Sequence, residues 1–277
     1  MSNYSAEVVN VPRVSHEWVT VDNDVIHLLD FGGPGQPVLF LHGVGGSAWT
    51  WAPVADQLHG AVRMIAVDLP GWGESRWRAD FDYTSHSLAA PLADVVAAIT
   101  PDPIDVVGFS WGGLIGLALA AQAPAAVRRL AMIDIPPATP LSDTDIPQLP
   151  TTFPDLEAAV AASRALAPRA TEQVLRRDAA HGVRPTPGGG YQKKIDPRLV
   201  QRWPFRNDNL WPELAAFTGE LLIVRAEQSQ TLNAEVAAQM ATTAHSATLH
   251  TIPDSGHLIP LERPAELAGT LRSFLQA

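Results

Sequence analysis

A serine flanked by glycines follows an apolar run in the middle of the chain. Residues 104–116 read Ile-Asp-Val-Val-Gly-Phe-Ser-Trp-Gly-Gly-Leu-Ile-Gly, which predicts a strand, a sharp turn and a helix of small residues. A turn that tight strains its central residue, Ser110, and leaves little room beside it, so Gly108 and Gly112 suit the flanking positions. The G-x-S-x-G pattern is typical of a nucleophile elbow, and Ser110 is therefore a candidate nucleophile for acyl transfer. The pattern alone is equally compatible with a serine that only caps a helix.

A serine nucleophile needs a general base, and His257 is the best placed of the nine histidines. It lies in the loop 254–260, directly after the last predicted strand at 247–252. The carboxyl ends of parallel strands meet at one edge of a sheet, so this loop is expected beside Ser110. The alternative is a surface-loop histidine. His42 precedes the nucleophile and suits a structural role, and the other histidines are expected at the surface or in packing.

Acyl transfer builds negative charge on the carbonyl oxygen, which two fixed backbone N–H groups can stabilise. The candidates for this oxyanion hole are Val44 and Trp111. Val44 lies in the loop after the predicted strand 38–41, and Trp111 directly follows the elbow serine. Their side chains would then shape the pocket. Otherwise both are ordinary core residues.

Alternating strands and helices are expected to position these groups. Besides the elbow strand, apolar runs predict buried strands at 38–41, 64–67, 130–135, 220–225 and 247–252. An antiparallel hairpin at 16–20 and 25–31 is expected to form an edge of the sheet. Because helical periodicity separates the other strands, the sequence predicts the α/β class, with a doubly wound, mostly parallel sheet of about eight strands.

The alternation of strands and helices breaks at residues 136–212. Prolines are frequent there, and helical patterns cover 156–167 and 171–181. We interpret this segment as an inserted helical cap without a conventional core of its own. The rest of the chain, 1–135 and 213–277, is then the α/β core domain.

Composition excludes several classes of protein. The chain has 277 residues, of which 46% are hydrophobic, so it can bury a large core. Its 19 basic and 29 acidic residues give a net charge of −10, which disfavours nucleic-acid partners. It has no cysteine, which excludes disulfides and thiolate nucleophiles, and no histidine–carboxylate cluster with the spacing of a metal site. No metal or other cofactor is expected.

The sequence shows no sign of membrane targeting. Residues 1–12 lack a basic-then-apolar signal, and no stretch approaches the apolar length of a membrane span. We therefore expect a soluble, cytoplasmic protein whose partner is a small-molecule substrate and not a membrane. The sequence leaves the oligomeric state open.

Four pieces of the sequence resemble the α/β-hydrolase fold family, and the match covers nearly the whole chain. They are His42-Gly43-x-x-Gly46-Ser47, Asp68-Leu69-Pro70-Gly71-x-Gly73-x-Ser75, Gly108-Phe109-Ser110-Trp111-Gly112-Gly113 and Gly256-His257-x-x-Pro260-x-Glu262-x-Pro264. The resemblance implies a triad in which Ser110 attacks, His257 moves the proton and a carboxylate orients the imidazole. It also implies that Asp68 shapes a loop and is not the triad acid.

The acid is where the sequence departs from the commonest family pattern. Most members place an aspartate after the strand 221–225 at the position of Ser229, and a serine cannot hold an imidazolium by charge. Asp134 is the favoured replacement, because it ends the strand after the elbow helix, where some members carry the acid. Glu227 is the alternative and Asp254 a weaker one. Asp134 could instead be a strand-end residue that bonds nearby backbone.

Serine at position 110 favours acyl chemistry over that of dehalogenases and epoxide hydrolases of this fold, which use an aspartate there. We expect a serine hydrolase of the carboxylic-ester-hydrolase kind, acting on a small, mainly apolar ester, lactone or related acyl compound. Cap aromatics could line an apolar pocket or simply pack, together with Trp49, Trp51, Trp72 and Trp111. The alternatives are a C–C bond hydrolase, amidase, acyltransferase or perhydrolase with the same triad, and a ligand-binding module with little turnover.

Overall fold

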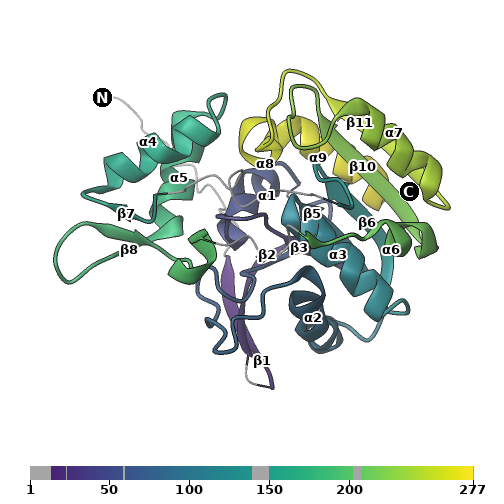
Figure 1. The fold of residues 1–277 in the computed structure, drawn as a ribbon, viewed down its shortest axis with the longest axis horizontal. Helices are drawn as coiled ribbons and strands as arrows, with labels where there is room; N and C mark the ends of the chain where they lie inside the picture. Colours follow the sequence, from purple (N-terminus) through teal and green to yellow (C-terminus); the bar gives the residue numbers. More distant parts are fainter. Residues whose placement is uncertain (1–13, 23, 59, 139–149, 202–206, 277) are drawn as a thin grey trace, which may run out of the picture.

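An eight-stranded sheet forms the centre of the computed structural model, which describes residues 14–22, 24–58, 60–138, 150–201 and 207–276 (Figure 1). Its strands lie in the order β1-β2-β4-β3-β5-β6-β10-β11. They are β1 (Ser15–Val21), β2 (Asp24–Gly32), β3 (Pro37–Leu41), β4 (Arg63–Val67), β5 (Ile104–Phe109), β6 (Val127–Ile133), β10 (Glu220–Ala226) and β11 (Ala247–Ile252). The β1–β2 and β2–β4 pairs are antiparallel and the other pairs are parallel, which confirms the predicted fold class and the hairpin edge.

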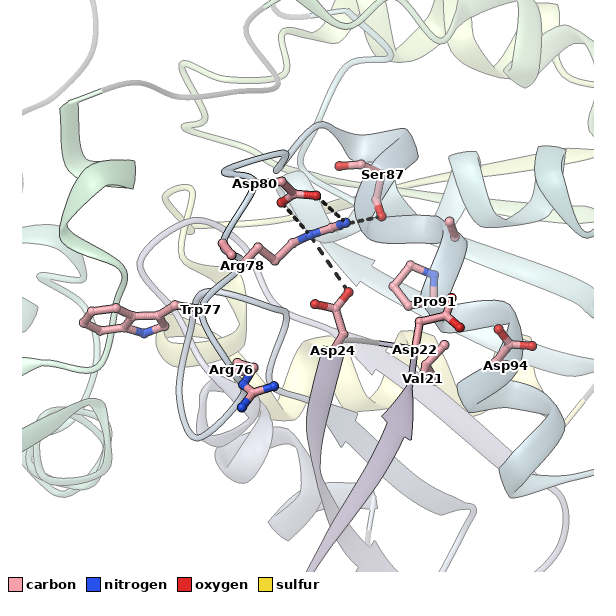
Figure 2. Close-up of a pocket in the computed structure, with 12 residues that line it drawn as sticks. Val21, Asp22, Asp24, Arg76, Trp77, Arg78, Asp80, Ser87, Pro91 and Asp94 are labelled. Carbon is pink, nitrogen blue, oxygen red and sulfur yellow. Dashed lines mark hydrogen bonds and ion pairs between the residues drawn. The ribbon is translucent and has the colours of Figure 1, made fainter.

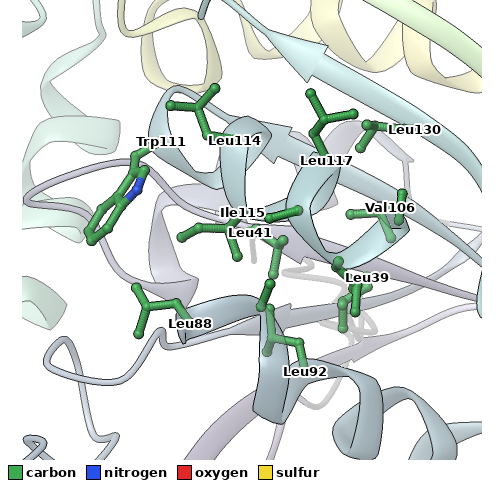
Figure 3. Packing of buried hydrophobic residues seen from close by; sticks show 14 of the residues in the cluster. Leu39, Leu41, Leu88, Leu92, Val106, Trp111, Leu114, Ile115, Leu117 and Leu130 are labelled. Carbon is green, nitrogen blue, oxygen red and sulfur yellow. The ribbon is translucent and has the colours of Figure 1, made fainter. Parts of the chain in front are cut away.

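Helices cover both faces of the sheet. One face carries α2 (Ser85–Ile99), α3 (Trp111–Gln122), α6 (Trp211–Ala216) and α7 (Ala234–Thr243). The other face carries η1 (Ala48–Trp51), α1 (Ala52–Leu58) and α9 (Pro264–Leu275), with the short α8 (Ile259–Glu262) before α9. Successive strand residues point to opposite layers, so Leu39 packs on the α3 side and Phe40 on the α1 side. Figure 3 shows the first layer, where Leu88 and Leu92 of α2 lie beside Ile115 of α3.

The turn between β5 and α3 has no space for side chains at two glycines. A Cβ placed on Gly108 would lie 2.3 Å from the carbonyl oxygen of Gly112, and one on Gly112 would lie 2.3 Å from that of Leu41. Between them Ser110 has φ 52° and ψ −128°, a conformation that few L residues adopt. The predicted strained elbow is therefore present.

Replacing Gly112 by alanine should destabilise the protein, because backbone atoms of β3 cannot move aside for the added methyl group. We expect the free energy of unfolding to fall by about 1–3 kcal/mol. Gly269 in α9 is the matched control, since a Cβ there meets nothing within 4 Å. Gly269→Ala should leave stability unchanged or raise it by up to about 1 kcal/mol. Urea unfolding of both variants tests this, and equal stabilities would contradict the packing argument.

The described part of the insertion, residues 150–201, lies to one side of the sheet (Figure 1). It contains β7 (Thr152–Phe153), α4 (Leu156–Leu166), α5 (Glu172–Gly182), β8 (Val183–Pro185), β9 (Tyr191–Lys193) and η2 (Pro197–Gln201). The two helices agree with the sequence prediction. The small antiparallel sheet β7-β9-β8 was not predicted, because strands of two or three residues show no clear alternation.

The prediction that the insertion lacks a core of its own is wrong. A separate apolar cluster holds Phe153, Ala159, Val160, Ala167, Leu175, Ala179 and Val183 together with Leu261. Its members are mostly small, which explains why composition did not reveal it. The division into a core domain at 1–135 and 213–277 and a cap at 136–212 stays a prediction. Residues 1–13, 23, 59, 139–149, 202–206 and 277 of these two parts lie outside the described residues.

The hypothesis that four tryptophans face one pocket is wrong. Trp51, Trp72 and Trp111 are fully buried, and Trp51 lies on the α1 face of the sheet while the other two lie on the α3 face. Trp72 and Trp111 meet edge to face, with ring centroids 5.2 Å apart. Trp49 is partly buried and stacks on His181 of α5. These rings fill the core and its joint with the insertion.

The insertion is joined to the sheet domain by a stacked ring pair and an ion pair. The His181 and Trp49 ring centroids lie 3.5 Å apart with an interplanar angle of 11°. Arg177 donates to Asp56 of α1 over 2.8 Å.

Among the described residues, no helix is both long and apolar enough to cross a membrane.

Acidification should weaken the contact between His181 and Trp49 that joins the insertion to the sheet domain. Burial lowers the pKa of His181 below its ordinary value of 6.5, and the nearby Lys194, Arg177 and His16 lower it further. The neutral ring therefore contributes stability that is present above pH 6.5 and is lost as pH falls toward the folded-state pKa. We expect the urea midpoint to decrease from about pH 7.5 to about pH 5.5, and to decrease less in His181→Gln. An identical decrease in both proteins would contradict this assignment.

Candidate active site

Backbone hydrogen bonds tie together the ends of three adjacent strands. The N–H of Ser110, after β5, donates to the carbonyl of Ile133 at the end of β6 over 2.8 Å. The N–H of Asp134, the next residue, donates to the carbonyl of Val224 in β10 over 2.7 Å. Both Ser110 and Asp134 have positive φ, 52° and 54°, so each strand turns sharply at this edge. The two side chains are thereby brought to neighbouring positions.

His257 links these two side chains. Its Nε2 lies 3.1 Å from the Ser110 Oγ, and its Nδ1 lies 2.7 Å from Asp134 Oδ2. Asp134 is fully buried, whereas the His257 side chain keeps 33% of its surface exposed. When Nδ1–H donates to the carboxylate, Nε2 is left to accept the proton of the Ser110 hydroxyl. The structure therefore brings together the three residues singled out in the sequence.

The Asp134 carboxylate is held by two further donors. Oδ1 accepts the N–H of Ala226 over 2.9 Å, and Oδ2 accepts the hydroxyl of Ser229 over 2.5 Å. The Ser229 oxygen in turn accepts the N–H groups of Thr231 and Leu232. In the sequence, Ser229 stands out only as the position where the usual aspartate is missing. In the structure its hydroxyl donates to Asp134, and the only signal in the sequence was its place in the loop after β10.

The two alternative acids lie elsewhere. Glu227 accepts the N–H of Asp254 over 2.9 Å, and Asp254 forms an ion pair with Arg263. Within the described residues, the His257 ring nitrogens have hydrogen bonds to Asp134 and Ser110 and none to these two carboxylates. Geometry thus favours Asp134 over Glu227 and Asp254.

The loop after β3 lies against the elbow. A Cβ placed on Gly43 would lie 2.8 Å from the Ser110 Cβ, which sets Val44 next to the serine in space. Trp111 is the first residue of α3 and directly follows Ser110. Its indole is fully buried and donates to the Ser85 hydroxyl over 2.7 Å. The backbones of both predicted oxyanion-hole residues are therefore close to Ser110.

His42 holds this loop in place. It is fully buried, its Nδ1 lies 2.8 Å from the Gly43 carbonyl oxygen, and its Nε2 accepts the N–H of Leu69 over 3.1 Å. Burial lowers the pKa of His42, so the ring is neutral and can donate at one nitrogen and accept at the other. This confirms the structural role expected from the sequence.

Asp68 organises the neighbouring loop. Its carboxylate accepts the N–H groups of Ala48 and Glu74 and contacts His27 Nδ1 at 2.7 Å. Burial raises the pKa of Asp68, but the hydrogen bonds, led by the one from His27, outweigh burial and leave the pKa below its usual value. Asp68 therefore shapes a loop, in agreement with the family resemblance. His27, expected at the surface or in packing, is fully buried and also contacts His16.

The loop that carries His257 is connected to the insertion. The N–H of Gly256 donates to the buried Glu262 over 2.6 Å. Arg169, between α4 and α5, lies 3.9 Å from Glu262 and 3.5 Å from Asp254. Glu262 belongs to the last family motif, but nothing in the sequence singled out Arg169. Its two ion pairs attach the insertion to the histidine loop.

A large surface hollow of about 680 Å³ lies apart from these residues (Figure 2). It is bounded by the β1–β2 turn, the segment 76–80 and α2. Arg78 lies across it and pairs with Asp24 and Asp80. None of its lining residues belongs to the Ser110 site.

In the described ranges, no group of three or more histidine, aspartate or glutamate side chains could hold a metal ion.

Comparisons with known proteins agree with the fold. A family model described as alpha/beta hydrolase fold matches residues 36–264. An esterase from Mycobacterium tuberculosis is 30% identical over 98% of this chain and 93% of its own. Its solved structure superposes with a TM-score of 0.79 at 28% identity, covering 97% of this chain and 94% of that one.

Two hydrolases are also similar along most of their length. The 3-hydroxybutyrate-oligomer hydrolase of Cupriavidus necator is 28% identical over 86% of this chain and 89% of its own. The 2-hydroxymuconate semialdehyde hydrolase of a Pseudomonas species is 27% identical over 96% of this chain and 95% of its own.

Proposed function

Because this chain belongs to the α/β-hydrolase fold family and is an enzyme of the carboxylic-ester-hydrolase-like kind, we propose that it cleaves a small, mainly apolar ester, lactone or related acyl substrate through an acyl-enzyme on Ser110. The observation that carries the proposal is the continuous hydrogen-bond line from Ser110 through His257 to Asp134. A serine, a histidine and an aspartate connected in this order by hydrogen bonds catalyse acyl transfer. The similarity to the Mycobacterium tuberculosis esterase supports an ester as substrate.

In the proposed first half-reaction, Ser110 Oγ attacks the carbonyl carbon while His257 Nε2 takes the hydroxyl proton. The buried Asp134 carboxylate stabilises the imidazolium that forms. The N–H groups of Val44 and Trp111 receive the negative oxygen of the tetrahedral adduct. His257 then returns the proton to the leaving alcohol, and the acyl-enzyme remains.

In the second half-reaction, water attacks the acyl-enzyme and gives its proton to His257 Nε2. The new adduct collapses, the carboxylic acid leaves, and the proton returns to Ser110 Oγ. The cycle uses only side chains and backbone of this chain, a small-molecule substrate and water. The two carbonyl adducts share one oxyanion site, so both half-reactions depend on the same loop after β3.

Hydrolysis of a carbon–carbon bond next to a carbonyl is the second candidate. The similarity to the 2-hydroxymuconate semialdehyde hydrolase over nearly the whole chain is the observation that favours it. The same three side chains would serve, but the leaving group would be a carbanion and not an alkoxide. The fully formed triad geometry disfavours a ligand-binding module without turnover.

Product analysis separates these candidates. We expect purified protein to release acid and alcohol from short p-nitrophenyl and alkyl esters, with kcat/KM at least about 100-fold above that for matched diketones. A slowly deacylating ester should add one acyl mass to the peptide that contains Ser110. Faster cleavage of the diketones would replace the ester proposal by the carbon–carbon one.

A further inference from the structure

A narrow slot lies between the insertion and the loop that follows Gly43. Gly45, Gly46 and Ser47 line it on the side of the sheet domain. On the insertion side it is lined by Ser163 of α4, Asp178 of α5 and Lys193 of β9, with apolar residues around them. Its volume of about 20 Å³ has room for one water-sized group. The slot is thus small and polar at its insertion end.

The two charged groups of the slot do not pair with each other. Among the described residues, the Lys193 ammonium has no ion-pair partner within 4.0 Å. Asp178 accepts a hydrogen bond from the Ser163 hydroxyl over 3.1 Å, and it forms no ion pair with any other described residue. Lys194, one residue further on, instead contacts Glu74 at 2.6 Å. Lys193 is therefore a cation near a carboxyl group with a gap between them.

Asp178 and Lys193 are both half-buried, so each is partly withdrawn from water. Burial lowers the pKa of Lys193, an effect that the charge of Asp178 opposes. It also raises the pKa of Asp178, against the effects of Lys193 and the Ser163 hydroxyl. Each charge is therefore only partly hydrated, and a group that bridges the two would add a hydrogen bond to each. The slot favours a ligand that satisfies both.

A hydroxyl group fits this requirement best. It can accept a hydrogen bond from the Lys193 ammonium and donate one to the Asp178 carboxylate at the same time. A carboxylate brings two oxygens into a space for one and meets the like charge of Asp178. A methyl group leaves both polar groups unsatisfied. The geometry therefore selects a neutral group that is both donor and acceptor.

The slot is within reach of a substrate held at Ser110. Gly43 lies against the Ser110 Cβ, and Gly45 is two residues further along the same loop. Two residues span at most about 7 Å, which is the length of a chain of roughly five bonds. A substituent several atoms from the scissile carbonyl can therefore reach the Gly45 side of the slot.

We propose that the slot formed by Ser163, Asp178 and Lys193 beside Gly45–Ser47 binds a hydroxyl group of the ester substrate, carried on its acyl or its alcohol part. This assignment rests on the proposed ester hydrolysis at Ser110 and names a substrate class within it. The substrate then carries a hydroxyl group several atoms away from the scissile bond.

The test uses matched esters of one chain length. Ethyl hexanoate is compared with its 3-, 4-, 5- and 6-hydroxy forms, with the monoethyl ester of the corresponding dicarboxylic acid and with the monohexanoate of ethanediol. Butyl hexanoate is compared with the monohexanoate of butanediol. We expect kcat/KM for at least one hydroxylated ester to exceed that of its plain counterpart by about 10-fold, which is the size of one satisfied polar contact. Acyl and diol forms show which part of the substrate carries the group.

Variants link the preference to the slot. In Lys193→Met the ratio of hydroxylated to plain kcat/KM should fall to near one, and Ser163→Ala should lower it by a smaller factor. Lys194→Met removes an ammonium from the neighbouring residue and should keep the ratio of the unmodified protein. Thermal unfolding of each variant shows that it is folded, and Ser163→Ala provides the test if Lys193→Met is not.

Each remaining outcome overturns the assignment. Equal kcat/KM for hydroxylated and plain esters means that the slot holds only water, and the hydrolase proposal stands. A preference for the dicarboxylic monoester assigns the slot to an anion. A hydroxyl preference that persists in Lys193→Met places the hydroxyl elsewhere. Absence of turnover with every ester, together with unlabelled Ser110, rejects the hydroxyl subsite and the proposed function together.

Discussion

Replacing Ser110 by alanine is expected to lower kcat/KM for an ester by about 10⁴-fold or more. The expected loss is this large because the Ser110 Oγ is the atom aligned with His257 Nε2, at 3.1 Å, and without it no covalent acyl-enzyme forms. The remaining oxyanion donors can still polarise a bound carbonyl, so a small residual rate is expected. Steady-state kinetics with one chromogenic ester measures the effect.

Labelling by a fluorophosphonate separates loss of the nucleophile from loss of structure. The unmodified protein should gain one phosphonyl group on Ser110, and Ser110→Ala should gain none. Ser273→Ala, which removes an exposed hydroxyl from α9, is the control and should keep both rate and labelling. Turnover in Ser110→Ala at the rate of the unmodified protein would end the acyl-enzyme proposal.

The sequence predicted those parts of the fold that depend on local rules. Gly108 and Gly112 reveal the elbow because the turn excludes any Cβ there. Strands buried on both faces read as continuous apolar runs, so their order along the chain was visible. The small sheet of the insertion was missed because its strands are too short. Its core was missed because most of its members are alanine or valine.

The site was harder to predict wherever it depends on contacts between distant segments. Asp134 and Glu227 both follow strands that end at the same edge, and only the bond from Asp134 to Val224 fixes which carboxylate faces His257. The tryptophans were ambiguous for a similar reason. Trp51 of η1, Trp72 of the loop after β4 and Trp111 of α3 lie outside the strands, so only the packing of those segments decides which face of the sheet each ring covers. Lys193 gave no signal, because its missing partner is a property of the folded chain.

Replacing Asp134 by asparagine is expected to lower kcat/KM by about 10³–10⁴-fold. The amide keeps the shape of the side chain but carries no charge to stabilise the imidazolium. It can also present its NH₂ to His257 Nδ1, which favours the wrong tautomer. The matched control is Glu227→Gln, which keeps an oxygen for the N–H of Asp254 and should change kcat/KM by less than about threefold. The reverse result, a large loss only in Glu227→Gln, would assign the acid to Glu227.

Exchanging the acid and its donor tests why this chain can have a serine after β10. Ser229 Oγ and His257 Nδ1 both form hydrogen bonds with Asp134 Oδ2, at 2.5 and 2.7 Å. A carboxylate at position 229 would therefore lie close to the imidazole. Asp134→Ser alone should lose activity as severely as Asp134→Asn. The double variant Asp134→Ser/Ser229→Asp should have a kcat/KM at least about 10-fold above that of Asp134→Ser. In it, position 229 after β10 supplies the carboxylate and position 134 after β6 supplies the hydroxyl. No recovery in a folded double variant would show that His257 requires the carboxylate at the end of β6, where the positive φ of Asp134 aims it.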